Sequence, residues 1–63
     1  MAKIVEIVGV ELKKKGDDNY SITHVILDDG EEATGFGEFK VGERVQRFYD
    51  DRYDKVKIKK NKY

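Results

Sequence analysis

The chain of 63 residues contains no cysteine, no proline and no tryptophan, and it has a single histidine. The lack of cysteine excludes disulfide bonds, and it also excludes a structural zinc site built from cysteine and histidine. Small domains often depend on such crosslinks, because a chain of this length buries only about 60% of its unfolded surface. The hydrophobic core must therefore suffice alone, or a second copy of the chain must complete it in a homodimer.

Long apolar segments are also missing. The most apolar run, from Ile4 to Val10, is short and is interrupted by Glu6, so it is neither a membrane span nor the centre of a signal peptide. The absence of cysteine fits a reducing compartment. These features predict a cytoplasmic protein with no membrane contact, folded as one small domain over residues 1–63.

The residue types needed for covalent catalysis are scarce. Without cysteine, a nucleophile would have to combine Ser21 with His24, and residues three apart on a strand point to opposite faces. The acidic side chains at residues 28–32 lack the ligand spacing of a calcium loop, and no glycine cluster precedes a helix that could bind phosphate. We therefore expect a protein that is not an enzyme and that uses no metal or cofactor.

The chain does contain runs of β-branched residues that are separated by glycines and acidic turns. The run from Lys55 to Lys60 alternates strictly, with lysines on one face and Val56 and Ile58 on the other, as in a strand with one buried face. Asp29-Gly30 is a strong signal for a hairpin turn. The segments that favour strands are residues 3–13, 20–27, 32–37, 44–50 and 55–60.

The alternation breaks in the first of these runs. Val5 and Ile7 share one parity, whereas Val10 and Leu12 have the other. One extra residue near Val8–Gly9 would restore a single inward row, which predicts a β-bulge in a long, bent strand. A bent first strand shared between two halves of a sheet is what a small closed barrel requires. Two separate short strands are the alternative.

Five short strands without a crossover helix predict an all-β fold. The expected architecture is a small five-stranded antiparallel barrel, OB-like or SH3-like, and the bent first strand favours the OB-like form. A helix over residues 42–53 is the main alternative, because Val45, Phe48 and Tyr49 have the i, i+3, i+4 spacing of a helix face. The lack of an N-cap residue before Glu43 argues against this helix.

The charges are segregated along the chain, although 13 basic and 13 acidic residues cancel overall. Residues 16–39 contain seven acids and no lysine or arginine, whereas residues 40–63 contain nine bases and four acids. This arrangement predicts two faces of opposite potential, unless the unlike charges interleave once the chain folds.

The C-terminal hairpin combines bases with aromatic residues. Single-stranded nucleic-acid binders pair a cationic groove with exposed rings that stack on bases, so a non-enzymatic nucleic-acid-binding module is the first hypothesis, with single strands favoured. Because Phe48 and Tyr49 are adjacent on a strand, we expect at least one of them in the core. The structural alternative is that the aromatic residues fill the core and that the lysines protect an exposed sheet edge from aggregation. The predicted nucleic-acid-binding residues are Arg47, Tyr49, Arg52, Tyr53, Lys55, Lys57 and Lys59.

The acidic segment 16–39 supports a second hypothesis, a small protein-interaction module or inhibitor. A surface without bases suits a basic partner protein, and an exposed strand edge offers another way to dock. A chain of this size is common among phage accessory proteins, so a phage-encoded inhibitor is one form of this hypothesis. The predicted partner-binding residues are Asp28, Asp29, Glu31 and Glu32.

Overall fold

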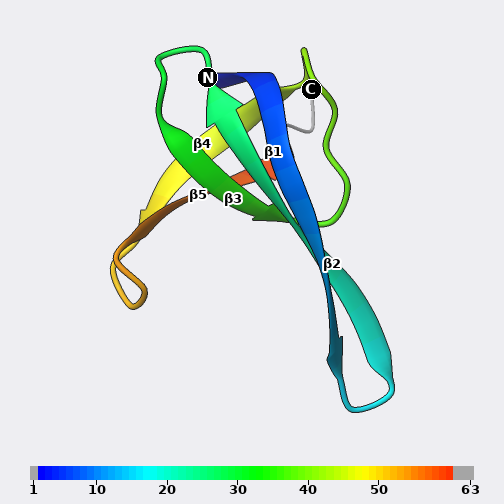
Figure 1. The fold of residues 1–63 in the computed structure, drawn as a ribbon. Helices are drawn as coiled ribbons and strands as arrows, with labels where there is room; N and C mark the ends of the chain where they lie inside the picture. Colours follow the sequence, from blue (N-terminus) through cyan, green and yellow to red (C-terminus); the bar gives the residue numbers. More distant parts are fainter. Residues whose placement is uncertain (1, 61–63) are drawn as a thin grey trace.

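The computed structural model describes residues 2–60, which form five β-strands and no helix (Figure 1). The all-β prediction is therefore confirmed, and residues 44–50 form a strand where the helix was the alternative. No helix in the described part of the chain is long and apolar enough to cross a membrane. The strands are β1 (Ala2–Lys15), β2 (Asp18–Leu27), β3 (Glu32–Phe36), β4 (Arg44–Asp50) and β5 (Lys55–Lys60).

The five strands form one sheet that closes on itself in the order β1-β2-β3-β5-β4. Closure depends on two antiparallel pairs between β1 and β4, Ala2 with Val45 and Lys3 with Arg44. The prediction of an entirely antiparallel sheet is wrong, because β3 and β5 run parallel. The chain leaves β3, crosses to the far side of the sheet as β4, and reverses in a hairpin. This route brings β5 alongside β3 in the same direction.

The bend in β1 occurs where the sequence predicts it. The register with β2 slips between Ile7 and Gly9, and it slips a second time between Ile4 and Glu6. The predicted inward row is wrong, because Ile4 is fully buried whereas Val10 and Leu12 are 57% and 86% exposed. The physical reason is that β1 pairs with β4 only at Ala2 and Lys3, so Val10 and Leu12 lie beyond the closed ring of strands that surrounds the core.

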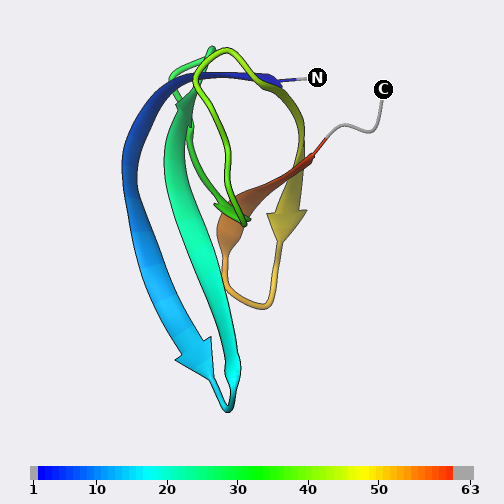
Figure 2. The same ribbon diagram turned by 90° about the vertical axis from the view of Figure 1, so that its right-hand side faces the viewer.

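Two hairpins project from the closed sheet. Residues 12–21, the long arm, pair with each other through β1 and β2 and turn at residues 16–17. At the base of this arm the Ser21 carbonyl also accepts a hydrogen bond from the Gly37 N–H at 2.9 Å. Residues 49–56, the short arm, join β4 to β5 through a turn at residues 51–54. Figures 1 and 2 show both arms at the same end of the molecule, with the end of β3 between them.

The core lies inside the closed sheet and is completed by Phe39, from the segment that joins β3 to β4. Gly35 makes room for this ring, because a Cβ atom there would lie 2.6 Å from the Phe39 ring and 2.8 Å from Ile58. The buried Thr23 hydroxyl donates a hydrogen bond to the Gly37 carbonyl at 2.6 Å, which ties the same segment to β2. The buried apolar residues are Ala2, Ile4, Val25, Leu27, Ala33, Phe39, Val45 and Ile58.

Candidate nucleic-acid interface

Side chains on the outer face of the sheet line up in rows across the strands, because neighbouring strands are paired residue by residue. One row crosses all five strands and consists of Gly9, His24, Thr34, Lys57 and Phe48. The adjacent row contains Glu11, Ile22 and Phe36. These residues come from segments that are far apart in the sequence, and only the closed sheet brings them together.

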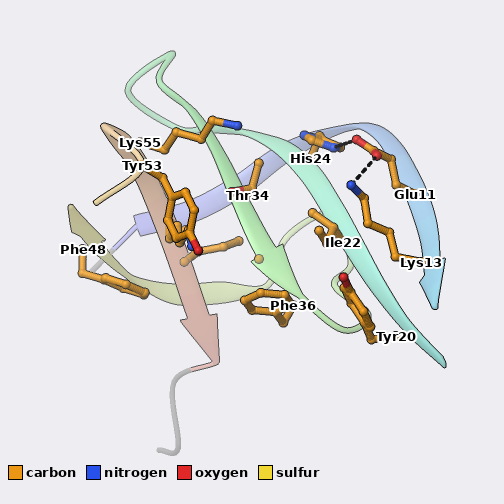
Figure 3. A pocket seen from close by; sticks show the side chains of 13 residues that line it. Glu11, Lys13, Tyr20, Ile22, His24, Thr34, Phe36, Phe48, Tyr53 and Lys55 are labelled. Atoms are coloured by element: carbon orange, nitrogen blue, oxygen red, sulfur yellow. Dashed lines mark hydrogen bonds and ion pairs between the residues drawn. The ribbon is translucent and has the colours of Figure 1, made fainter. Parts of the chain in front are cut away.

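A cleft of about 340 Å³ lies over these two rows, between the long arm and the short arm (Figure 3). Its floor comes from β2, β3 and β5, and its walls come from the two hairpins. Three lysines and a single carboxylate, that of Glu11, contribute the formal charges of its lining. The aromatic residues of the cleft are Tyr20, Phe36, Phe48 and Tyr53, and its lysines are Lys13, Lys55 and Lys57.

The aromatic rings of the cleft remain accessible. Phe36 is 64% exposed and Tyr53 is 61% exposed, while Phe48 and Tyr20 are partly covered. The Tyr20 and Phe36 rings are tilted against each other with centroids 6.0 Å apart. Four accessible rings in one cleft form a surface on which flat, apolar groups can stack.

Lys57 lies at the centre of the cleft and contacts a carboxylate and two aromatic rings. Its Nζ atom is 3.0 Å from Asp50 Oδ2, 4.4 Å from the centroid of the Tyr53 ring and 5.6 Å from that of Phe36. The hydrogen bond from Lys57 lowers the pKa of the Asp50 carboxyl, and the backbone N–H of Arg52 contributes to the same shift. These contacts hold the short arm, and therefore Tyr53, over the sheet.

The opposite wall carries a polar group of three side chains. Glu11 Oε1 lies 2.6 Å from His24 Nε2, and Glu11 Oε2 lies 3.7 Å from Lys13 Nζ. The hydrogen bond with His24, followed by the charge of Lys13, lowers the pKa of the Glu11 carboxyl. The carboxylate is therefore ionised at neutral pH. Figure 3 shows it on the wall that faces Tyr53 and Lys55.

Five of the residues predicted to bind nucleic acid lie in or beside the cleft. Tyr53, Lys55 and Lys57 line it. Arg52 and Lys59 stand at its margin, since the Arg52 guanidinium is 5.7 Å from the centroid of the Tyr53 ring and Lys59 Nζ is 5.9 Å from that of Phe48. The strict alternation of β5 explains why its lysines share one face.

Arg47 and Tyr49, the other two predicted residues, do not line the cleft. The Arg47 guanidinium donates hydrogen bonds to the Asp29 carboxylate and, at 2.9 Å, to Glu31. These contacts raise the pKa of Arg47, and the Arg47 hydrogen bond lowers that of Asp29. The Tyr49 hydroxyl donates to the Asp54 carboxylate, and this contact raises the pKa of Tyr49.

The expectation that Phe48 or Tyr49 enters the core is wrong. Phe48 is 42% exposed in the cleft and Tyr49 is 59% exposed on the other face of β4. The sheet closes through Arg44 and Val45 at the start of β4. The later residues of the strand therefore lie beyond the core on both faces.

The acidic hairpin between β2 and β3 is partly neutralised by the protein itself. Asp29 and Glu31 hold Arg47, whereas Asp28 and Glu32 are exposed. In the described part of the chain, none of the three lysines of the cleft forms an ion pair with a carboxylate of residues 16–39. The acidic hairpin therefore neutralises Arg47 and not the cleft lysines, of which Lys57 pairs with Asp50 and Lys13 with Glu11.

The sequence did not predict several of the cleft residues as binding residues, namely Glu11, Lys13, Tyr20, Phe36 and Phe48. The alternation of the strands could have identified two of them. Tyr20 lies on the opposite face of its strand from the buried Thr23, and Phe36 lies on the opposite face of its strand from the buried Ala33. The contribution of β1 could not be found in this way, because the bulges disrupt its alternation.

Comparison with known proteins gives no relative for this chain, since no family model, no curated protein and no solved structure matches it. We therefore infer the function from the geometry and chemistry of the cleft.

Proposed function

We propose that the protein is a non-enzymatic module that binds single-stranded nucleic acid in the cleft between its two arms. The observation that carries the proposal is the convergence of four accessible aromatic rings and three lysines in one cleft. Binders of single strands need both kinds of group, because lysines attract the phosphates and aromatic rings stack on the bases. In a duplex the faces of the bases are already stacked, so the rings favour a single strand.

The strand arrangement supports the finer assignment of an OB-type barrel. OB-folds are five-stranded Greek-key barrels that bind oligonucleotides or oligosaccharides on the face of strands 2 and 3, between the loops that follow strands 1 and 4. The cleft occupies the equivalent position, with β2 and β3 in its floor and the β1–β2 and β4–β5 hairpins as its walls.

The proposal revises the set of binding residues. Arg47 and Tyr49 leave the set, because intramolecular hydrogen bonds hold them outside the cleft. Arg52 and Lys59 stay as cations at the margin, where they can reach phosphates that extend beyond the cleft. The proposed contacts to phosphates are Lys13, Lys55 and Lys57, and the proposed stacking residues are Tyr20, Phe36, Phe48 and Tyr53.

Fluorescence anisotropy with labelled oligonucleotides at several salt concentrations tests this proposal. We expect the single strand to bind more tightly than a duplex of the same sequence, with an affinity that falls as salt rises. Lys55→Ala should reduce the slope of log K against log salt by about 0.7, the value for one phosphate contact on a single strand. Arg47→Ala is the matched control and should leave the slope unchanged. No binding at micromolar protein in low salt would refute the proposal.

A protein-interaction module remains the second candidate, and one observation favours it. Beyond Ile4, whose backbone bonds to Gly42 and Glu43, β1 has no strand paired to its second edge in the described part of the chain, and Val10 and Leu12 are exposed on this strand. An open edge can accept a strand from a partner or from a second copy of the chain. Light scattering after gel filtration distinguishes a monomer from a homodimer. A strictly monomeric protein would exclude self-association through this edge.

A further inference from the structure

Among residues 2–60, Glu11 is the only one that contributes a carboxylate to the lining of the cleft. Its side chain is 52% exposed, and its ionised state is favoured by His24 and Lys13. A fixed negative charge repels the phosphates that the neighbouring lysines attract. Its presence is therefore unfavourable for binding a polyanion, unless the ligand gives hydrogen bonds to it.

We propose that Glu11 makes the cleft select single strands that contain guanine. This inference rests on the proposed function. A carboxylate only accepts hydrogen bonds, and it can accept two side by side. Guanine presents two adjacent donors, N1–H and the N2 amino group, on its Watson–Crick edge, which is accessible in a single strand. Thymine and uracil present one donor between two carbonyl oxygens, and these oxygens repel a carboxylate.

The register of the sheet gives a base the right surroundings for this contact. Glu11 and Phe36 flank Ile22 on its two sides, so their backbones are about two strand spacings, roughly 10 Å, apart. A base that stacks against Phe36 covers Ile22 and turns its outer edge toward Glu11. The Phe36 ring is 64% exposed and can accept such a base.

Glu11 also has free capacity to accept hydrogen bonds. Oε2 is 3.7 Å from Lys13 Nζ, which is beyond hydrogen-bond distance. Oε1 is engaged by His24 at 2.6 Å, and this contact fixes the orientation of the carboxylate on the wall of the cleft. The arrangement leaves one oxygen open and the other with a spare lone pair, which suits the two donors of guanine.

Binding of three oligonucleotides of about eight nucleotides, a length suited to one small barrel, tests the inference. The first contains only thymidine, the second has one central guanine, and the third has hypoxanthine in its place. We expect the guanine strand to bind about tenfold more tightly than the thymidine strand. The hypoxanthine strand should lie between them, because hypoxanthine has the same ring system and lacks only the amino group.

Glu11→Gln should remove most of the preference for guanine over hypoxanthine, and it should strengthen binding of the thymidine strand because a repulsive charge is lost. Glu6→Gln is the matched control, since Glu6 is an exposed glutamate on the same strand outside the cleft lining, and it should retain the wild-type preference. If Glu11→Gln changes all three affinities by the same factor, the inference is overturned while the proposed function stands. If none of the strands binds, both are overturned.

Discussion

At the level of single residues, the cleft is defined by large side chains that remain open to water. Phe36 and Tyr53 each expose more than half of their surface, although burial of such rings elsewhere in a small core would favour folding. Lys57 lies between them and contacts both rings. The two rings are therefore held apart on the floor and on the wall of the same cleft, where we propose that each stacks on a base.

Replacement of either ring should weaken binding without unfolding the protein. Phe36→Ala and Tyr53→Ala should each cost about 1–3 kcal/mol of binding free energy for a single strand, the usual contribution of one stacked base. Tyr49→Ala is the control, because it removes an equally exposed tyrosine outside the cleft lining. Anisotropy titrations measure all three, and an equal loss in the control would contradict the assignment of the cleft.

Gly35 provides a prediction for stability. Gly35→Ala places a methyl group against the Phe39 ring and Ile58, so it should lower the free energy of unfolding by about 1–3 kcal/mol through overpacking. Gly9→Ala is the matched control in the same sheet, since nothing lies within 4 Å of a Cβ atom at Gly9. Urea denaturation compares the two variants. A Gly35→Ala variant as stable as the wild type would show that the Phe39 ring is not packed against β3.

At the level of strands, local sequence patterns were sufficient to predict a strand and its orientation where the strand has one buried face. The alternation of residues 55–60 and the turn signals around it predict β5 and its outward lysines correctly. The break in the alternation of β1 correctly predicts the bulge at Val8. The parallel pairing of β3 with β5 was missed, because no local pattern encodes which distant strand lies alongside.

The candidate site was predictable only on the side that comes from the C-terminal hairpin. Tyr53, Lys55 and Lys57 are close in sequence and have a shared face, so local alternation identifies them. The wall formed by Glu11 and Lys13 comes from the other end of the chain and depends on the register between β1 and β2. Such a register follows from the bulges and from the closure of the sheet, not from residue types.

The long arm should be the least protected part of the sheet. In its outer part, residues 13–19, the described chain pairs only within one hairpin, whereas Tyr20 packs against Phe36 at its base. A two-stranded hairpin without further packing is marginally stable in water. We expect backbone amides of the arm to exchange with deuterium much faster than those of Thr23 and Val25, which lie where β2 is paired on both sides. Hydrogen exchange followed by NMR measures this difference. Equal protection in both regions would mean that another contact covers the arm.

At the level of the whole molecule, carboxylates with lowered pKa values make the fold sensitive to acid. Their folded-state pKa lies below the unfolded one, so they stabilise the protein above the ordinary carboxylate range, and this contribution is lost as the pH falls through it. The unfolding temperature should therefore fall below about pH 4. Asp50→Asn should reduce this drop, because it removes the ion pair with Lys57. Asp17→Asn, at an exposed turn, should retain the wild-type profile.

The charge distribution of the molecule is compatible with the proposed binding of a polyanion, although the protein has no net charge. The acidic hairpin is partly neutralised by Arg47, and the cleft lysines form no ion pair with residues 16–39 in the described part of the chain. The proposed binding would therefore depend on local potential and not on net charge.

The most direct test of the cleft is an NMR titration of the isotope-labelled protein with a short single-stranded oligonucleotide. We expect the largest shifts of backbone amide signals across the sheet at Ile22, Thr34 and Lys57, and we expect these shifts to saturate as the oligonucleotide is added. Signals from the acidic hairpin at residues 28–32 should change little. Shifts centred on that hairpin, or no shifts at millimolar oligonucleotide in low salt, would contradict the binding of single strands in the cleft.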